Sequence, residues 1–218
     1  MTEFRKMTEV YMSKLAEIPT YPCEYVNYTN EIWERIAAVS LVDVVTGGDV
    51  LESTHVKVCW DDNALYARFE CVDTHVVSQY TNRKDPLWEQ DVVEMFIDEE
   101  GKCRRYMELV VSPNGVLCDV MIDHDDENDP NSFKVGSEWE VQGFEQKIEA
   151  EGERRTYTFR LPFSNFSKAP QDGTQWRVNF FRIDDEPNGT RHYQAWSPTG
   201  AENYHISDRF GRLVFTRS

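Results

Sequence analysis

The sequence predicts an all-β protein, an antiparallel β-sandwich or jelly roll with one or two short N-terminal helices. From about residue 54 onward, apolar and polar residues alternate in short segments that turn residues separate. Helical spacing is confined to the N-terminal part of the chain. Many short strands with few helices are typical of two packed β-sheets. The 218 residues are enough for one sizeable core, so we expect one β-sandwich domain over residues 21–218.

Two short helices are expected before the strands. Apolar residues recur with helical spacing from Phe4 to Ile18, and the pattern stops at Pro19. This spacing predicts an N-terminal helical extension within residues 1–20. A second helix is expected over residues 30–39, because its apolar residues have the same spacing and an asparagine stands at its start as an N-cap.

The expected strands follow in order along the chain. Residues 55–60 and 65–72 both alternate, and the Asp-Asp-Asn run between them is a turn signal, so the two segments predict a β-hairpin. Pro-Asn-Gly and Asp-Gly turn signals separate later segments. The further strands are expected over residues 92–98, 106–112, 116–122, 139–150, 156–161, 176–183, 192–196 and 213–215.

The net charge of the chain restricts the classes of partner that it is expected to bind. With 39 acidic and 23 basic residues the formal net charge is −16, and such a surface repels the phosphates of nucleic acids and of anionic membranes. We therefore expect neither nucleic acid nor membrane as a partner. The first residues lack the apolar region of a signal peptide, so the chain as it stands is expected to be cytoplasmic. A chain from which a signal had been removed would be periplasmic or secreted.

Cysteine and histidine spacing does not predict a required cofactor. The five cysteines are odd in number and contain no Cys-x-x-Cys, which argues against a disulfide framework and against a zinc ribbon. The five histidines show no His-x-x-x-His or His-Glu-x-x-His spacing, so a catalytic zinc site is not supported.

The most informative segment is the strand expected over residues 92–98. With period 2, one of its faces carries only apolar residues, and the other carries Val92, Glu94 and Phe96. The strand is therefore expected to be buried on both faces, and a carboxylate in that setting is costly unless it is paired or hydrogen-bonded. Trp88, just before the strand, offers a flat apolar plate. A plate beside a carboxylate is the chemistry of sugar recognition.

Two further charges fall inside apolar strands, Glu108 and Arg182. One interpretation is that Arg182 and Glu94 form a buried structural pair. The other is that the three charges line a ligand pocket. We favour the pocket, because a closed network would cost stability without an evident return.

Two of the six tryptophans border loops, Trp88 and Trp196. Aromatic residues on loops of a rigid β-scaffold are better binding candidates than those within strands. The alternative is that each of them caps one end of the core.

An acidic run is a candidate calcium site. Its carboxylates stand at alternate positions, and hard oxygen ligands at such spacing can hold Ca²⁺. The run lacks the glycine and the glutamate that an EF-hand loop needs at the corresponding positions, so a solvated acidic loop is the alternative. The four candidate ligands are Asp123, Asp125, Glu127 and Asp129.

Several motifs occur in one order along the chain, and together they carry a family resemblance. They are Val-Lys-Val-Cys-Trp-Asp at 56–61, Asp-Pro-Leu-Trp-Glu-Gln-Asp at 85–91, Glu-Met-Phe-Ile-Asp at 94–98, Tyr-Met-Glu at 106–108, Trp-Arg-Val-Asn-Phe-Phe-Arg at 176–182, Ala-Trp-Ser-Pro at 195–198 and Phe-Gly-Arg-Leu-Val-Phe at 210–215. With them, the sequence over roughly residues 20–216 resembles carbohydrate-binding module family 9.

The resemblance implies a β-sandwich related to the DOMON superfamily. It also implies attachment to xylan-degrading enzymes, structural calcium, and a sugar, often a reducing end, gripped between two tryptophans. By their motifs, Trp88 matches the first of these tryptophans, Trp196 is the expected second, and Glu94 matches the sugar-bonding glutamate. The family's arginine on the next strand is absent from this sequence, and Glu108 falls near its place.

The leading hypothesis is a non-catalytic module that binds a mono- or oligosaccharide in glycan catabolism, with a glycoside hydrolase as its partner. Trp88 and Trp196 would stack on the sugar, and Glu94 with Glu108 or Arg182 would bond its hydroxyls.

Two alternatives stay open. A glycoside hydrolase needs two carboxylates at a set separation, one with a raised pKa, and Glu94 with Glu108 are the candidates. The second alternative is a haem-binding DOMON-type domain, which the superfamily resemblance implies, with Met95, Met107 and His205 as candidate iron ligands.

Overall fold

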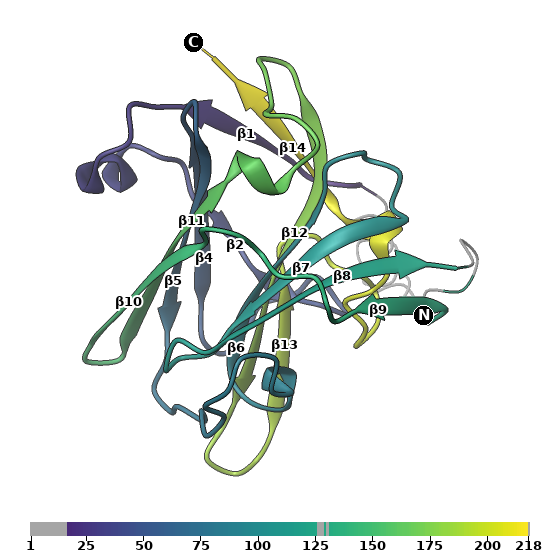
Figure 1. The fold of residues 1–218 in the computed structure, drawn as a ribbon. Helices are drawn as coiled ribbons and strands as arrows, with labels where there is room; N and C mark the ends of the chain where they lie inside the picture. The colour runs from purple at the N-terminus through teal and green to yellow at the C-terminus, as the bar shows by residue number, and fades with distance from the viewer. Residues whose placement is uncertain (1–16, 126–128, 130, 218) are drawn as a thin grey trace, which may run out of the picture.

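The computed structural model describes residues 17–125, 129 and 131–217 of the chain (Figure 1). These residues form a 14-stranded sheet. The strands are β1 (Thr20–Tyr25), β2 (Val39–Ser40), β3 (Val42–Asp43), β4 (Thr54–Trp60), β5 (Ala64–Val72), β6 (Val92–Asp98), β7 (Arg105–Val111), β8 (Leu117–His124), β9 (Phe133–Gly136), β10 (Glu145–Glu151), β11 (Arg154–Pro162), β12 (Gln175–Asp185), β13 (Arg191–Ala195) and β14 (Gly211–Thr216).

The sheet is continuous, and its strand order is β10-β11-β5-β4-β1-β14-β12-β6-β7-β8-β9. Strand β13 pairs with β12 and β3, and β2 pairs with β4. The pairing is antiparallel apart from β1, which runs parallel to β14 on one side and to β4 on the other. Strand β1 therefore joins an antiparallel half formed by β10, β11, β5 and β4 to a second half formed by β12, β6, β7, β8 and β9.

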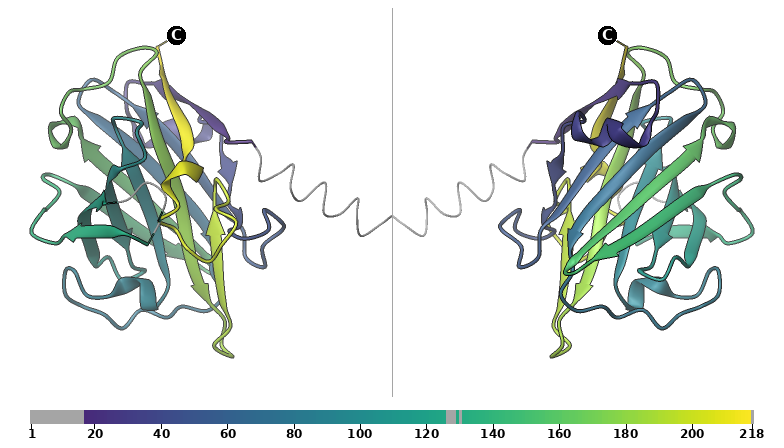
Figure 2. Two further views of the ribbon diagram at one scale, coloured as in Figure 1. Left: turned by 90° about the vertical axis from the view of Figure 1, so that its right-hand side faces the viewer. Right: turned by 90° about the vertical axis from the view of Figure 1, so that its left-hand side faces the viewer.

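The sheet curls so that its two halves lie face to face (Figures 1 and 2). A core of buried side chains from both halves fills the space between them. Burial of such apolar surface is the main term that stabilises the fold. The all-β, sandwich-like architecture expected from the alternation is confirmed. The two halves meet at Val58, Phe69 and Phe159 from one side and at Met95, Leu109 and Phe180 from the other.

A second apolar cluster covers the outer face of the β12-β6-β7-β8 half. Val92 and Phe96 of β6 belong to this cluster, together with Phe181 of β12 and with Tyr204 and Phe210 from the connection between β13 and β14. All seven residues of β6 are buried as a result. The expectation that this strand is buried on both faces is confirmed, with Glu94 on its outer face.

The helical expectations are only partly tested. The extension expected over residues 1–20 falls, up to residue 16, outside the described part of the chain. The helix expected over residues 30–39 is instead one 3-10 turn, η1 (Asn30–Glu34), whose N-cap is Thr29 rather than Asn30. The turn ends early because Val39 pairs with Val56 in the sheet, and this pairing prevails over helical spacing.

The other helical segments of the described chain are also single 3-10 turns. They are η2 (Leu87–Glu89), η3 (Phe163–Asn165) and η4 (Ser207–Arg209). In the described residues, no helix has the length and apolar character that crossing a membrane requires.

The expected hairpin over residues 55–72 is present as β4 and β5. Its turn is held by the Asp61 carboxylate, whose Oδ1 accepts hydrogen bonds from the amides of Asn63 at 2.7 Å and Ala64 at 2.9 Å. The strand expected over residues 139–150 begins only at Glu145. The preceding segment is tied down by a side chain instead, because the Val141 amide donates to Asp119 Oδ2 at 2.7 Å.

Trp196 packs between the two halves of the sheet, over the backbone of Gly211. Its ring lies 5.5 Å from that of Phe180 and 6.3 Å from that of Tyr21, measured between centroids. A Cβ at position 211 would lie 2.2 Å from Trp196 Cζ3, well inside van der Waals contact. Glycine at the start of β14 is therefore what allows the indole to lie flat on the sheet.

We predict that Gly211→Ala destabilises the protein by about 1–3 kcal/mol, because the added methyl group overpacks the core against the indole. Urea denaturation measures the change. The double variant Gly211→Ala with Trp196→Leu should be more stable than the sum of the two single changes, since the smaller side chain relieves the clash. Strictly additive effects would contradict this packing.

Candidate functional site

A pocket of about 430 Å³ lies on the outer face of the β6, β7 and β8 strands. This volume is in the range of small-molecule sites. Strands β9, β12 and β13 contribute to its walls, and the connections before β6 and after β13 contribute to its rim. Most of the wall is apolar, formed by Phe96, Val120, Ile122, Phe133 and Ile183.

Glu94 lies in the wall of this pocket with almost no solvent contact. It is 2% exposed, and its backbone neighbours on the adjacent strands are Phe181 and Val110. Within the described residues its Oε1 has no hydrogen-bond partner. Burial, together with the charge of Glu108, raises the pKa of the Glu94 carboxyl well above its ordinary value.

Glu108 comes from the next strand and faces the same pocket. It pairs with Phe96 in the β6-β7 ladder, so it is the diagonal neighbour of Glu94 on one face of the sheet. Diagonal neighbours are about 7–8 Å apart, within reach of two long side chains. Burial raises the pKa of Glu108 to about 8. Glu108 therefore holds a proton at neutral pH, and the raised pKa of Glu94 favours its protonated form as well; a protonated carboxyl can donate as well as accept hydrogen bonds.

Trp88 stands at the mouth of the pocket on η2. Its side chain is 48% exposed, whereas the neighbouring Leu87 is 1% exposed and anchors the turn in the outer-face cluster. Arg191 of β13 fixes the backbone of the turn by donating to the carbonyl oxygens of Trp88 and Glu89. Asp185 holds this arginine through Nε at 2.7 Å and Nη2 at 2.8 Å. The exposed indole is thus carried on a firmly attached turn.

Aromatic side chains complete the pocket on other sides. Tyr193, Tyr204, His205 and Phe133 all line it. Tyr204 is stacked on Phe181 with ring centroids 4.0 Å apart, and its hydroxyl donates to the carbonyl oxygen of Arg182 at 2.7 Å. These residues extend the apolar surface that a ligand would meet.

His205 does not add a positive charge. Its Nδ1 lies 2.7 Å from the Tyr106 hydroxyl, and burial followed by the nearby His124 lowers its pKa to about 4. The imidazole is therefore neutral at pH 7.

The structure brings Trp88, Glu94 and Glu108 together and separates them from Trp196 and Arg182. Phe181 pairs with Glu94 on the outer face, so Arg182, the next residue of β12, points to the opposite face. The same alternation along β13 carries Trp196 into the core between the two halves. The alternative interpretation of a Glu94–Arg182 pair is therefore wrong, and the favoured pocket contains Glu94 and Glu108 but not Arg182. Trp196, 7% exposed, does not line the pocket with Trp88.

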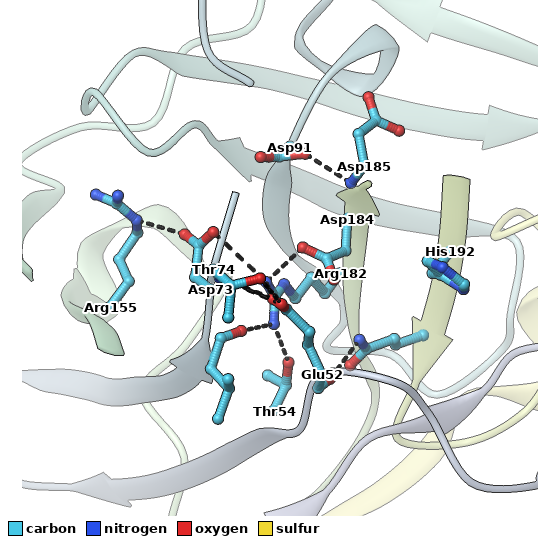
Figure 3. A network of polar contacts seen from close by, with 12 residues as sticks. Glu52, Thr54, Asp73, Thr74, Asp91, Arg155, Arg182, Asp184, Asp185 and His192 are labelled. Carbon is cyan, nitrogen blue, oxygen red and sulfur yellow. Dashed lines mark hydrogen bonds and ion pairs between the residues drawn. The ribbon is translucent and has the colours of Figure 1, made fainter. Parts of the chain in front are cut away.

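Arg182 belongs instead to a buried acidic network on the inner face (Figure 3). Its Nη2 lies 2.5 Å from Asp184 Oδ1 and 3.4 Å from Glu52 Oε2. Its Nη1 donates to the carbonyl oxygen of Val72 at 2.6 Å. Burial raises the pKa of Asp184 to about 6, and Arg182 acts against that rise.

Three carboxylates of this network could hold a metal ion: the ligand atoms of Glu52, Asp73 and Asp184 lie within 4.8 Å of one another. The Arg182 guanidinium already lies among them and supplies the positive charge that a cation would bring (Figure 3). This one guanidinium offsets part of the negative charge of the three carboxylates.

The calcium site expected in the acidic run stays a prediction. Glu127 lies outside the described residues. Asp123 is 3.4 Å from Arg105, and Asp125 is 2.8 Å from Lys134. Asp129 Oδ1 accepts the amide of Asn131 at 2.9 Å.

The three haem-ligand candidates lie on different faces of the sheet. Met95 and Met107 are buried in the core between the two halves, whereas His205 lines the outer pocket. Neither methionine therefore faces His205 across a common site where both could bind one haem iron.

Sequence reasoning overlooked much of the pocket wall. Phe133 and Tyr193 come from strands far from Glu94 in the chain, and only the sheet order brings them to one face. Of the ring side chains of that wall, only His205 was singled out from the sequence, and then as a candidate haem ligand.

Comparison with known proteins identifies the family. Residues 27–218 match the family model described as carbohydrate family 9 binding domain-like, and the chain belongs to this family. The resemblance stated from the motifs is confirmed.

Two relatives are similar in sequence. One is an extracellular protein of Arthroderma benhamiae, 25% identical over 173 residues, which make up 74% of this chain and 78% of that protein. The other is the exoglucanase XynX of Acetivibrio thermocellus, 24% identical over 212 residues, or 95% of this chain. The matched region is only 18% of the exoglucanase.

A solved structure shares the fold. It is a family 9 carbohydrate-binding module from Caldicellulosiruptor kristjanssonii in complex with cellotriose, with a TM-score of 0.70 and 17% identity. The match covers 91% of this chain and 94% of the module. The same comparison finds a glucose complex of a family 9 module from that organism at a TM-score of 0.69 and 16% identity, covering 91% of this chain and 96% of the module.

The raised pKa values predict that the free energy of unfolding falls as the pH rises. Between the ordinary value of 4.5 and the folded-state value of about 8, the folded protein keeps the Glu108 proton that the unfolded chain has lost. Glu108→Gln removes this contribution and should reduce the fall between pH 5 and pH 8.5 by at least about 1 kcal/mol, measured by urea denaturation.

The control is Glu24→Gln, which changes an exposed glutamate on β1. It should leave the fall unchanged. An equally steep pH dependence in the parent and in Glu108→Gln would contradict the assigned burial of this carboxyl.

Proposed function

We propose that this family member binds a mono- or oligosaccharide in the pocket that Trp88, Glu94 and Glu108 line. The observation that carries the proposal is the combination of an exposed indole at the mouth with a buried carboxyl, unpartnered at one oxygen, in the wall. Sugars present hydroxyls around an apolar C–H face, so they need a plate and polar groups together. Both kinds of group converge here.

The two carboxyls suit hydroxyl groups well. In the protonated state each can donate one hydrogen bond and accept others, as each sugar hydroxyl can in return. A ligand that supplies partners for Glu94 would offset the cost of burying it, which is greatest while its oxygen is unpaired. Specific binding rather than simple apolar contact is the expected result.

Trp88 requires a second plate if the sugar is to be held on both faces. Trp196 was expected in that role, but its ring lies in the core. We propose Tyr193 or Phe133 instead, since both line the same pocket as Trp88. The hydroxyls that bond to Glu94 and Glu108 would determine which end of the sugar chain, reducing or non-reducing, enters the pocket.

The related modules suggest the ligand class and the setting. Family 9 modules of the same fold have been solved with cellotriose and with glucose, so glucose-based oligosaccharides are the first candidates. The chain matches a small part of an exoglucanase, which supports a role beside a glycoside hydrolase.

A hydrolytic role of the pocket itself has less support. A retaining or inverting glycosidase needs one carboxyl as an acid and the other ionised as nucleophile or base. Here burial raises both pKa values, that of Glu108 to about 8, which disfavours the ionised form that a nucleophile or base needs. The arrangement favours binding over turnover.

We predict that Trp88→Ala lowers affinity for the best-binding oligosaccharide by at least about tenfold, because the stacking surface is lost. Since the side chain is 48% exposed, the free energy of unfolding should change by less than about 0.5 kcal/mol. Isothermal titration calorimetry and urea denaturation measure the two effects.

Leu51→Ala is the matched control, because Leu51 is 67% exposed and does not line the pocket. It should bind like the parent. Unchanged affinity in Trp88→Ala would overturn the placement of the site, and no binding of the parent to any mono- or oligosaccharide tested would overturn the function.

A further inference from the structure

We propose that the preferred ligand is an amino sugar, whose protonated amino group is held between Glu94 and Glu108. This inference rests on the proposed function and names the ligand class more closely. It starts from the two buried carboxyls of the pocket, for which the described part of the chain supplies no basic partner.

The two glutamates lie side by side without a basic partner among the described residues. They are 2% and 7% exposed, and each faces apolar neighbours on the adjacent strands. Arg182 is next in the chain to Phe181, the residue that pairs with Glu94. Its side chain nevertheless points to the other face of the sheet, where Asp184 and Glu52 hold it. An ammonium group entering with the ligand would supply the basic partner that the chain does not, and it would stabilise the ionised form of one of the two carboxyls.

The remaining basic groups at the pocket are also committed elsewhere. Lys84, at the rim, donates to the carbonyl oxygens of Ser137 and Trp139. His205 is bonded to Tyr106 and uncharged at neutral pH, because its pKa is about 4. Neither residue forms an ion pair with Glu94 or Glu108 among the described contacts.

A sugar ammonium suits this pocket better than a metal ion. Ca²⁺ takes six to eight oxygen ligands, whereas the wall beside the two carboxyls is formed by Phe96, Val120 and Ile122. An ammonium group has three donors, and one carboxylate together with one neutral carboxyl offers enough acceptors for it. The C–H face of the ring would then meet Trp88.

Burial makes the proposed contact selective. A buried ion pair is favourable when its geometry is good and its remaining polar atoms are bonded, and a charge-assisted hydrogen bond is about twice as strong as a neutral one. A neutral sugar can form only the weaker kind with protonated carboxyls. The amine is therefore expected to raise affinity over the matching hydroxyl.

The contact should also move a proton. When R–NH₃⁺ binds, one glutamic acid loses its proton to solvent and becomes the carboxylate partner, so charge balances in the complex. Because burial raises the pKa of Glu108 to about 8, that carboxyl holds such a proton at pH 7 before binding. The other ionisable groups that face the pocket are Lys84, Cys118, Tyr193, Glu202, Tyr204 and His205.

The experiment is calorimetry of the parent protein at pH 7 with glucosamine, N-acetylglucosamine and glucose, and with their short β-1,4 oligomers. Glucosamine should bind at least about tenfold tighter than glucose, and acetylation of the amine should remove the advantage. Titrations in buffers of different ionisation enthalpy should detect release of about one proton with glucosamine and none with glucose.

Two further conditions separate the buried contact from general attraction to a protein of net charge −16. In 0.5 M salt the preference should persist, because buried pairs are screened much less than exposed ones. Glu108→Gln should bring the ratio of the two affinities close to one, as should Glu94→Gln. Glu24→Gln, an exposed change on β1, should keep the ratio of the parent.

Equal affinity for glucosamine and glucose, or a preference that survives both glutamine variants, would overturn this inference while leaving sugar binding in place. Tight binding of Ca²⁺ alone that these variants abolish would also overturn it, in favour of a metal. Absence of binding to every sugar in the panel would overturn the proposed function itself.

Discussion

The structure depends on one strand being packed on both of its faces. Strand β6 lies between the core that joins the two halves of the sheet and the apolar cluster on the outer face, so each of its side chains is withdrawn from water. A polar group there must be stabilised by a neighbour or by a ligand. The neighbour of Glu94 is a second buried carboxyl, that of Glu108. The two carboxyls give the otherwise apolar outer face a pair of hydrogen-bonding groups.

Much of this could be predicted from local alternation. The strand over residues 92–98 was expected with its observed bounds, and the period of 2 assigned Glu94 to the correct face. Trp88 was recognised because it borders a loop and offers an apolar plate just before the strand that carries Glu94. These inferences needed only neighbours in sequence, which the rigid geometry of a strand makes reliable.

The relation between distant strands could not be predicted in the same way. Whether Arg182 faces Glu94 depends on the register of β12 against β6, which pairs Phe181, not Arg182, with the glutamate. A shift of one residue would have reversed the result. Trp196 was also assigned to the wrong place. Its sequence resembles a loop, which conceals the fact that the residue continues the alternation of β13. Strand β1, with a proline at its centre, carried no strand pattern and was not expected.

The attachment of η2 has a consequence for the energetics of recognition. Arg191 bonds the carbonyl oxygens of Trp88 and Glu89 while Asp185 holds the arginine, so the turn that bears the indole is ordered before any ligand arrives. An interface that is assembled in advance avoids the entropy that a loose loop would lose on association. In the proposed complex, the hairpin of β12 and β13, which supplies Asp185 and Arg191, thereby sets how much of the contact energy survives as affinity.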